Sequence, residues 1–233
     1  MTTLEIRLAD VCHRIHQACK AAGRDPAHVS LLAVSKLQPA QAVRQAQQAG
    51  QQAFGENYVQ EALDKMAALA DLRGTIEWHL IGPLQSNKTR AVAEAFDWVH
   101  SVDRLKIAQR LSEQRPATMP PLNVCLQVNI SGEASKSGLP PQEVPQVAAA
   151  VAALPRLRLR GLMSIPEPAQ GLPAQQAPHR ALRLLLQDLN QRGLALDTLS
   201  MGMSDDLEAA VTEGSTMVRV GTAVFGARSP GAA

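Results

Sequence analysis

Lys36 is the residue of this chain whose type and place most clearly suggest chemistry. It ends the stretch 30–36, Ser-Leu-Leu-Ala-Val-Ser-Lys, whose apolar run has the length of a buried strand. Folds that combine parallel strands with helices place their chemistry at the carboxyl ends of such strands. Of the six lysines in the sequence, only Lys36 directly ends an apolar strand.

Two interpretations of Lys36 stay open from its spacing alone. Its stem can lie on apolar surface while the ammonium group stays in water, as in most lysines. Alternatively, desolvation lowers the pKa of the amine from about 10.4, so that it attacks a carbonyl group and forms a Schiff base. The choice between them depends on what other residues share the pocket.

A second group of chemical candidates lies near the C-terminal end. Residues 201–206, Met-Gly-Met-Ser-Asp-Asp, are predicted to turn from a strand into the N-terminus of a helix. Gly221 and Thr222 follow Arg219 and offer backbone N–H groups beside small side chains. Helix N-termini and glycine turns bind phosphate through such donors. The alternatives are that Ser204 only caps a helix and that Gly221 and Thr222 only pack the end of the fold.

Alternating apolar and amphipathic segments would position these residues. Strands are expected at 30–36, 53–57, 77–82, 98–103, 122–130, 157–165, 198–201 and 217–225. Helices are expected at 3–22, 39–49, 59–72, 87–96, 141–154, 174–192 and 204–212, and a further helix follows the fourth strand and ends at about residue 114. This rhythm predicts an α/β fold, a single (β/α)8 TIM barrel with an extra N-terminal helix, with residues 1–233 as one domain. An open doubly wound sheet is the second choice, although no Gly-x-Gly-x-x-Gly follows an early strand.

In a barrel the carboxyl ends of all strands meet at one mouth. Lys36 and Asn57 would then line the same pocket as the Gly221 and Thr222 turn. A lysine amine that faces a phosphate cradle suits an aldehyde carrying a phosphate, which indicates pyridoxal 5′-phosphate as the cofactor. His79 lies inside a predicted strand, so it either lines this pocket or is a hydrogen-bonded core residue.

Five longer motifs resemble the pyridoxal phosphate homeostasis protein family. They are residues 33–36, 54–58, 78–88, 199–206 and 218–226. That family looks like the barrel domain of alanine racemase standing alone, and the resemblance covers essentially the whole chain. It implies that Lys36 holds the cofactor as a Schiff base and that Arg219 faces the pyridine nitrogen. It also implies that the phosphate is held by Ser200, Ser204, Gly221 and Thr222. The residues that it places beside the ring are Asn57, His79 and Met201.

The same resemblance favours a carrier of the cofactor over an enzyme. Racemisation by two bases needs an acid or base on each face of the substrate, and the alanine racemase family supplies the second, a tyrosine, from a separate β-domain. This sequence ends at Ala233 and its only tyrosine is Tyr58. We therefore expect a protein of vitamin B6 homeostasis that buffers or delivers pyridoxal phosphate, without catalytic residues. The alternatives are an amino-acid racemase and a sugar-phosphate aldolase with a Schiff-base lysine.

Composition limits the partners and the compartment. A net charge of +2 and few aromatic residues argue against nucleic acid, and no apolar run is long enough to span a membrane. The N-terminus has no apolar signal segment, and three cysteines suggest free thiols in the cytoplasm. His13 and His16 lack the further ligands of a metal site. We expect a monomer that binds pyridoxal phosphate, has cofactor-free enzymes as possible recipients, and uses the loops 131–137 and 166–178 as lids.

Overall fold

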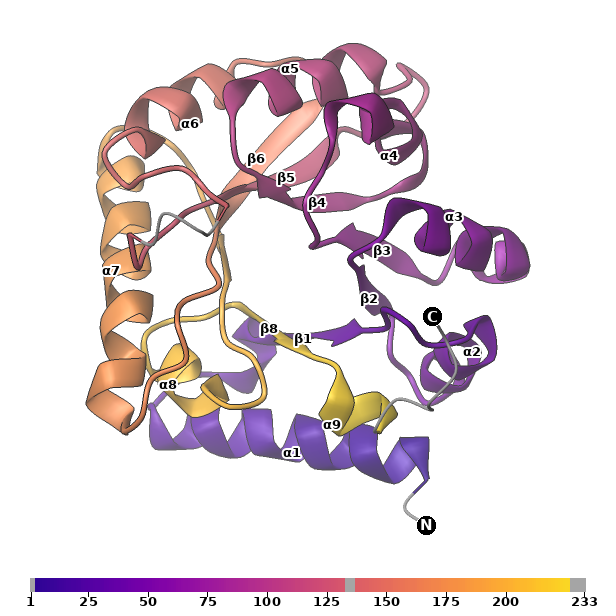
Figure 1. Cartoon of the computed structure of the whole chain (residues 1–233). Coiled ribbons are helices and arrows are strands. Elements are labelled where there is room, and N and C mark those ends of the chain that lie inside the picture. Colours follow the sequence, from indigo (N-terminus) through magenta and orange to yellow (C-terminus); the bar gives the residue numbers. More distant parts are fainter. Residues whose placement is uncertain (1–2, 133–136, 227–233) are drawn as a thin grey trace.

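The strands of the chain close into a parallel barrel in sequence order. A computed structural model gives the structure of the protein, and it describes residues 3–132 and 137–226. Each strand pairs with the next, and the last pairs with the first. The strands are β1 (Ser30–Val34), β2 (Ala53–Glu56), β3 (Glu77–Leu80), β4 (Trp98–Val102), β5 (Leu122–Gln127), β6 (Leu157–Met163), β7 (Thr198–Ser200) and β8 (Met217–Val220). The predicted (β/α)8 barrel is thus confirmed (Figure 1).

Helices form a ring around the barrel (Figure 1). They are α1 (Leu4–Ala21), α2 (Ala40–Gln48), α3 (Val59–Ala68), α4 (Thr89–Ala95), α5 (Leu105–Gln114), α6 (Val144–Ala152), α7 (Leu172–Gln191), α8 (Leu207–Thr212) and α9 (Thr222–Phe225). Short 3-10 turns are η1 (Pro26–His28), η2 (Ala70–Leu72) and η3 (Ser86–Lys88). The predicted extra N-terminal helix is α1, which runs beside α8 and α9. None of the helices in the described ranges is long and apolar enough to cross a membrane.

The two faces of the barrel sheet have different characters because successive strand side chains point to opposite sides. The main apolar core lies between the outer face and the helices, and it includes Trp78, Leu80 and Phe54. The inner face carries a small separate apolar cluster of Trp98, Cys125 and Met163, together with buried polar residues. The interior therefore holds a polar layer under the mouth of the barrel. That layer includes His79, His100, Ser200 and Arg219.

The end of the chain departs from the prediction of a strand over 217–225. β8 stops at Val220, and residues 222–225 form the short helix α9. An apolar run such as Ala-Val-Phe does not distinguish a strand from a buried helix by its periodicity. Contacts with a distant part of the chain favour the helix over the strand. Arg7 of α1 donates hydrogen bonds to the Val224 and Phe225 carbonyls, at 2.9 and 3.3 Å.

The loop after β7 also departs from the prediction. Ser204 was expected to cap a helix beginning beside it, but α8 starts at Leu207 and Asp206 takes the capping position. The Asp206 carboxylate accepts a hydrogen bond of 2.6 Å from the Met203 N–H, which closes the loop on itself. Ser204 is therefore free of a capping role.

The two predicted lid loops are only partly seen as loops. The second, expected over 166–178, is shorter because α7 already begins at Leu172 and includes Pro178. Pro173 lies in the first turn of α7, where its missing N–H costs little, whereas Pro178 lies inside the helix and removes one backbone hydrogen bond. The first, expected over 131–137, includes residues 133–136, which lie outside the described residues.

Candidate functional site

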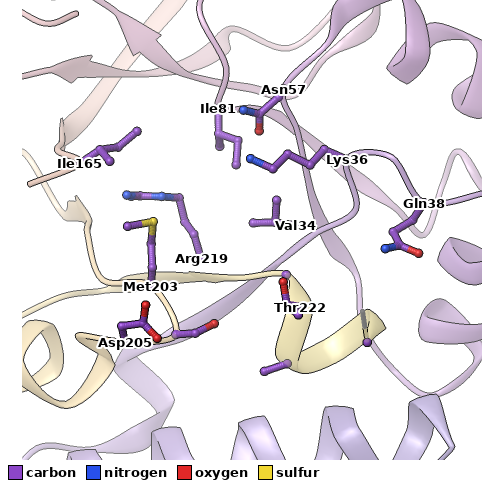
Figure 2. Close-up of a pocket in the computed structure, with 14 residues that line it drawn as sticks. Val34, Lys36, Gln38, Asn57, Ile81, Ile165, Met203, Asp205, Arg219 and Thr222 are labelled. Atoms are coloured by element: carbon purple, nitrogen blue, oxygen red, sulfur yellow. The ribbon is translucent and has the colours of Figure 1, made fainter. Parts of the chain in front are cut away.

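A cavity of about 600 Å³ opens where the carboxyl ends of the barrel strands meet. Its lining comes from the carboxyl ends of β1 and β8 and from the segments that follow β1, β2, β3, β6, β7 and β8. The lining residues are Val34, Lys36, Gln38, Asn57, Ile81, Ile165, Met203, Ser204, Asp205, Arg219, Gly221, Thr222, Ala223 and Gly226. Figure 2 shows Lys36 and Asn57 together at one side of the cavity, and Arg219 beside Met203 at the other.

The structure brings six of the nine predicted site residues to this cavity. They are Lys36, Asn57, Ser204, Arg219, Gly221 and Thr222. The other three, His79, Ser200 and Met201, are fully buried and do not line it. His79 and Ser200 lie in the polar layer beneath the cavity, where they are hydrogen-bonded to other side chains.

The backbone around Lys36 is tied on both sides. Lys36 lies two residues beyond the end of β1, and Leu37 after it adopts a left-handed conformation with φ of 60°. A bulky residue takes that conformation only at a cost, so other contacts must hold it. The Leu37 N–H donates a 2.6 Å hydrogen bond to Glu61, and the Ser35 carbonyl before Lys36 accepts one of 2.6 Å from Lys65. These contacts fix the direction in which the Lys36 side chain leaves the backbone.

Lys65 is not the surface residue that its helical spacing to Glu61 suggests. Only 6% of its side chain is exposed, and its Nζ lies 2.7 Å from Glu56 and 2.6 Å from Glu61. Glu56 also accepts a hydrogen bond of 2.6 Å from the Ser35 hydroxyl. Burial raises the pKa of Glu56, and the Lys65 ammonium opposes that rise. We call Ser35, Glu56, Glu61 and Lys65 the ionic network.

Arg219 enters the opposite side of the cavity from β8. Its Nη1 donates to the Ser200 carbonyl and hydroxyl at 2.5 and 2.8 Å, and its Nη2 donates to the Ser164 carbonyl at 2.8 Å. All three acceptors are uncharged. Burial lowers the pKa of Arg219 to about 10, so the guanidinium still carries its charge at neutral pH. Within the described residues it makes no ion pair, so this charge is available to a ligand.

Small groups and hydroxyls border the third side of the cavity. Gly221 turns the chain from β8 into α9, whose first N–H groups have no partner within the helix. A Cβ atom at position 221 would lie 3.2 Å from the Val34 carbonyl oxygen, so a larger residue would crowd β1. Thr222 and Ser204 add hydroxyl groups to the lining. The buried His179 of α7 holds the Ser204 loop through a 2.9 Å contact with Asp206.

The chemistry of these donors fits a small phosphorylated aldehyde. A lysine amine can bond a carbonyl carbon, and an arginine and the hydroxyl and N–H donors suit anionic or aromatic acceptors. The Oδ1 atom of Asn57 is buried and accepts no hydrogen bond from the described residues, so the cavity offers an acceptor as well. The described histidines, cysteines and carboxylates form no group that could hold a metal ion.

Sequence reasoning did not single out His100. It is completely buried in β4 and contacts both His79 and Ser200, at 2.9 and 2.8 Å. The available signal was strand alternation, which turns a histidine in each of two adjacent strands toward the barrel interior. The lining residue Ile165 was also missed as a site residue. Met203 and Asp205 fell within the predicted turn 201–206, but no contact with a ligand was assigned to them.

Comparisons with known proteins agree with one another. The family model of the alanine racemase N-terminal domain matches residues 6–229. The pyridoxal phosphate homeostasis protein of Pseudomonas aeruginosa is 66% identical over 232 residues, which cover 100% of this chain and 99% of that protein. The one from Escherichia coli is 55% identical over 229 residues, 98% of each chain.

A solved structure extends the likeness to three dimensions. PipY of Synechococcus elongatus, described with pyridoxal phosphate bound, superposes with a TM-score of 0.83 at 39% identity. The superposition covers 96% of this chain and 100% of PipY. The chain therefore belongs to the alanine racemase N-terminal domain family and, within it, to the pyridoxal phosphate homeostasis proteins.

Proposed function

We propose that this protein holds pyridoxal 5′-phosphate on Lys36 and takes part in keeping the supply of that cofactor balanced. The observation that carries the proposal is the meeting of Lys36, Arg219 and the Gly221 and Thr222 turn in one cavity. The printed names of the relatives and the pyridoxal phosphate in the PipY structure support it. When bound, the cofactor supplies an aldehyde on an electron-poor aromatic ring.

Each side of the cavity has a role in this proposal. The Lys36 amine condenses with the aldehyde, so that a carbon–nitrogen double bond forms and water leaves. Ser204, Thr222 and the first N–H groups of α9 hold the phosphate. Arg219 lies at the pyridine nitrogen, where its positive charge disfavours protonation of the ring. Asn57 borders the ring, and Ser200 contributes through its contacts with Arg219. His79 and Met201 lie deeper in the barrel and do not line the cavity.

The cavity lining supports a carrier rather than an enzyme. Two-base racemisation needs a second acid or base across the substrate from the lysine. Among the described lining residues the other ionisable side chains are Arg219, charged at neutral pH, and Asp205, which Figure 2 places on the side away from Lys36. Tyr58 is 54% exposed and does not line the cavity.

The proposal includes the setting in which the protein works. We propose a monomer in the cytoplasm that passes the cofactor to enzymes lacking it. The cysteines of the chain, Cys12, Cys19 and Cys125, are free thiols, which suits a reducing compartment. Light scattering would report the mass, and transfer to a cofactor-free aminotransferase would report delivery.

A titration with pyridoxal 5′-phosphate tests the central part. The wild-type protein is expected to develop a visible absorption band that saturates at one equivalent, and Lys36→Ala is expected to show none. Lys106→Met, at an exposed position of α5, is the control and should behave as the wild type. A colourless wild type would refute the proposal. Amino-acid racemisation at an enzyme-like rate, lost in Lys36→Ala, would replace the carrier by a racemase.

A further inference from the structure

A chain of buried side chains runs through the barrel interior from Arg219 to the far end of β3. Arg219 contacts the Ser200 hydroxyl at 2.8 Å, and that hydroxyl contacts His100 Nδ1 at 2.8 Å. His100 Nε2 lies 2.9 Å from His79 Nδ1, and His79 Nε2 lies 2.8 Å from Glu77. The four members from Arg219 to His79 are each at most 4% exposed. The chain therefore joins the cavity to the opposite end of the barrel.

With both imidazoles neutral, the chemistry of the two ends sets the direction of every hydrogen bond between them. A guanidinium can only donate, so the Ser200 oxygen accepts from Arg219 and its hydrogen goes to His100 Nδ1. His100 then carries its proton on Nε2 and donates to His79 Nδ1. His79 carries its proton on Nε2 and donates to the Glu77 carboxylate, which can only accept when ionised. With both imidazoles neutral, every donor and acceptor along the chain is used.

The surroundings of His100 favour its neutral form. Burial holds the pKa of His100 well below its ordinary value, and the positive charge of Arg219 acts in the same direction. Burial would raise the pKa of Glu77, but the hydrogen bond from His79 helps to hold it below its ordinary value. A positive end at Arg219 and a negative end at Glu77 also polarise the hydrogen bonds between them in one sense.

We propose that His100 and His79 are positioning residues of the cavity. His100 accepts from the Ser200 hydroxyl and is itself held by its contact with His79. The Ser200 oxygen thus stays turned toward Arg219, and the guanidinium is held where a ligand meets it. The proposal rests on the proposed function, since it concerns how Arg219 is presented to pyridoxal 5′-phosphate. Neighbouring contacts support a fixed geometry, because Trp98 stacks on His79 with ring centroids 5.3 Å apart and Arg160 lies 4.7 Å from the Trp98 ring.

Two substitutions at His100 separate an acceptor role from simple packing. His100→Phe keeps a ring but removes both nitrogens, so the Ser200 hydroxyl loses its acceptor. His100→Asn places an amide oxygen near the former Nδ1 and can accept from Ser200, although it loses the link to His79. Met163→Leu is the matched control, because Met163 is buried in the same interior and belongs to the apolar cluster beside the chain.

The readouts are the affinity for pyridoxal 5′-phosphate and the position of its visible band on the protein. We expect His100→Phe to weaken binding about tenfold and to displace the band, because Arg219 no longer meets the ring in the same way. His100→Asn should regain most of the affinity, and Met163→Leu should resemble the wild type. Glu77→Leu, at the half-exposed end of the chain, should displace the band in the same direction by less.

A folded His100→Phe with wild-type affinity and an unmoved band would overturn the inference, as would equal losses in His100→Phe and Met163→Leu. Urea denaturation of the cofactor-free proteins shows whether each variant folds. If His100→Phe does not fold, Glu77→Leu decides, and an unchanged affinity and band there overturn the inference. Failure of the wild-type protein to take up pyridoxal 5′-phosphate would instead refute the proposed function on which the inference rests.

Discussion

Lys36 and Arg219 face the same cavity, but the structure supports them from different places and with different chemistry. Behind Lys36, between β2 and α3, the ionic network uses buried charges to fix the backbone on each side of the lysine. Behind Arg219, inside the barrel, uncharged acceptors fix the guanidinium itself. One residue is held by its main chain and the other by its side chain.

The difference matches what each residue has to do in the proposed function. An amine that bonds and releases an aldehyde must move and change its charge, so its support acts on the neighbouring residues Ser35 and Leu37. A guanidinium that must keep its charge and its position can be held directly by its side-chain nitrogens, provided that no carboxylate neutralises it. A buried ion pair at Arg219 would have cancelled the positive charge that faces the ligand.

Breaking the ionic network should give the largest effect. Lys65→Met leaves Glu56 buried without its cation, which is expected to lower the free energy of unfolding by about 3–5 kcal/mol. Urea denaturation of the cofactor-free protein measures this. The double variant Lys65→Met with Glu56→Gln should recover much of the loss, because it removes the unpaired charge. A loss below about 1 kcal/mol in the single variant would contradict a structural role for the network.

A second prediction concerns the approach of two loops on the lysine side. A Cβ atom at Gly82 would overlap the carbonyl oxygen of Asn57, whereas one at Gly74 would meet nothing within 4 Å. Gly82→Ala is therefore expected to displace Asn57, destabilise the protein by about 1–3 kcal/mol and weaken binding of pyridoxal 5′-phosphate. Gly74→Ala is the control. Equal behaviour of the two variants in denaturation and titration would contradict the predicted clash.

A smaller effect is expected from the phosphate side. Ser204→Ala removes a hydroxyl from the lining and should weaken binding of pyridoxal 5′-phosphate roughly tenfold, as for a hydrogen bond to a charged group. The affinity for pyridoxal, which lacks the phosphate, should not change. Parallel titrations with the two compounds measure this. An equal loss for both would show that Ser204 does not act on the phosphate.

The smallest effect should appear only in acid. Burial alone would raise the pKa of Asp206, but hydrogen bonds from His179 and the Met203 N–H hold it below its ordinary value of 3.8. A lowered carboxyl pKa contributes stability above the unfolded value, and this is lost as the pH falls through the folded value. The stability advantage of the wild type over Asp206→Asn should therefore shrink as the pH falls below about 3.8. An advantage that stays constant across this range would contradict the assigned shift.

Strand alternation and helical periodicity were sufficient to predict the barrel, because each strand is an apolar run and each helix an amphipathic one. The same reasoning failed at residues 222–225, where an apolar run forms α9 and the contacts from Arg7 decide. Long-range contacts of this kind leave no local signal. The strand ends were nevertheless predicted well enough to place Lys36, Asn57 and the Gly221 and Thr222 turn near one mouth.

The support behind the site was harder to predict than the site itself. The four-residue spacing of Glu61 and Lys65 on a helix indicates a pair, but only the contact with Glu56 from β2 makes that pair part of a buried network. The chain through His100 depends in the same way on strands that are far apart in the sequence. Residues that contact a ligand follow strand ends, whereas residues that hold them depend on the packing between elements.

Reduction with borohydride, followed by peptide mass analysis, tests the central claim most directly. Borohydride converts a Schiff base into a stable secondary amine, so the cofactor stays attached to the lysine and adds its mass to the peptide. With one equivalent of pyridoxal 5′-phosphate, we expect the added mass on the peptide that contains Lys36 and unmodified peptides for the buried Lys65 and the exposed Lys106. A mass spread over several lysines, or absent from Lys36, would contradict the assignment of Lys36 as the anchor.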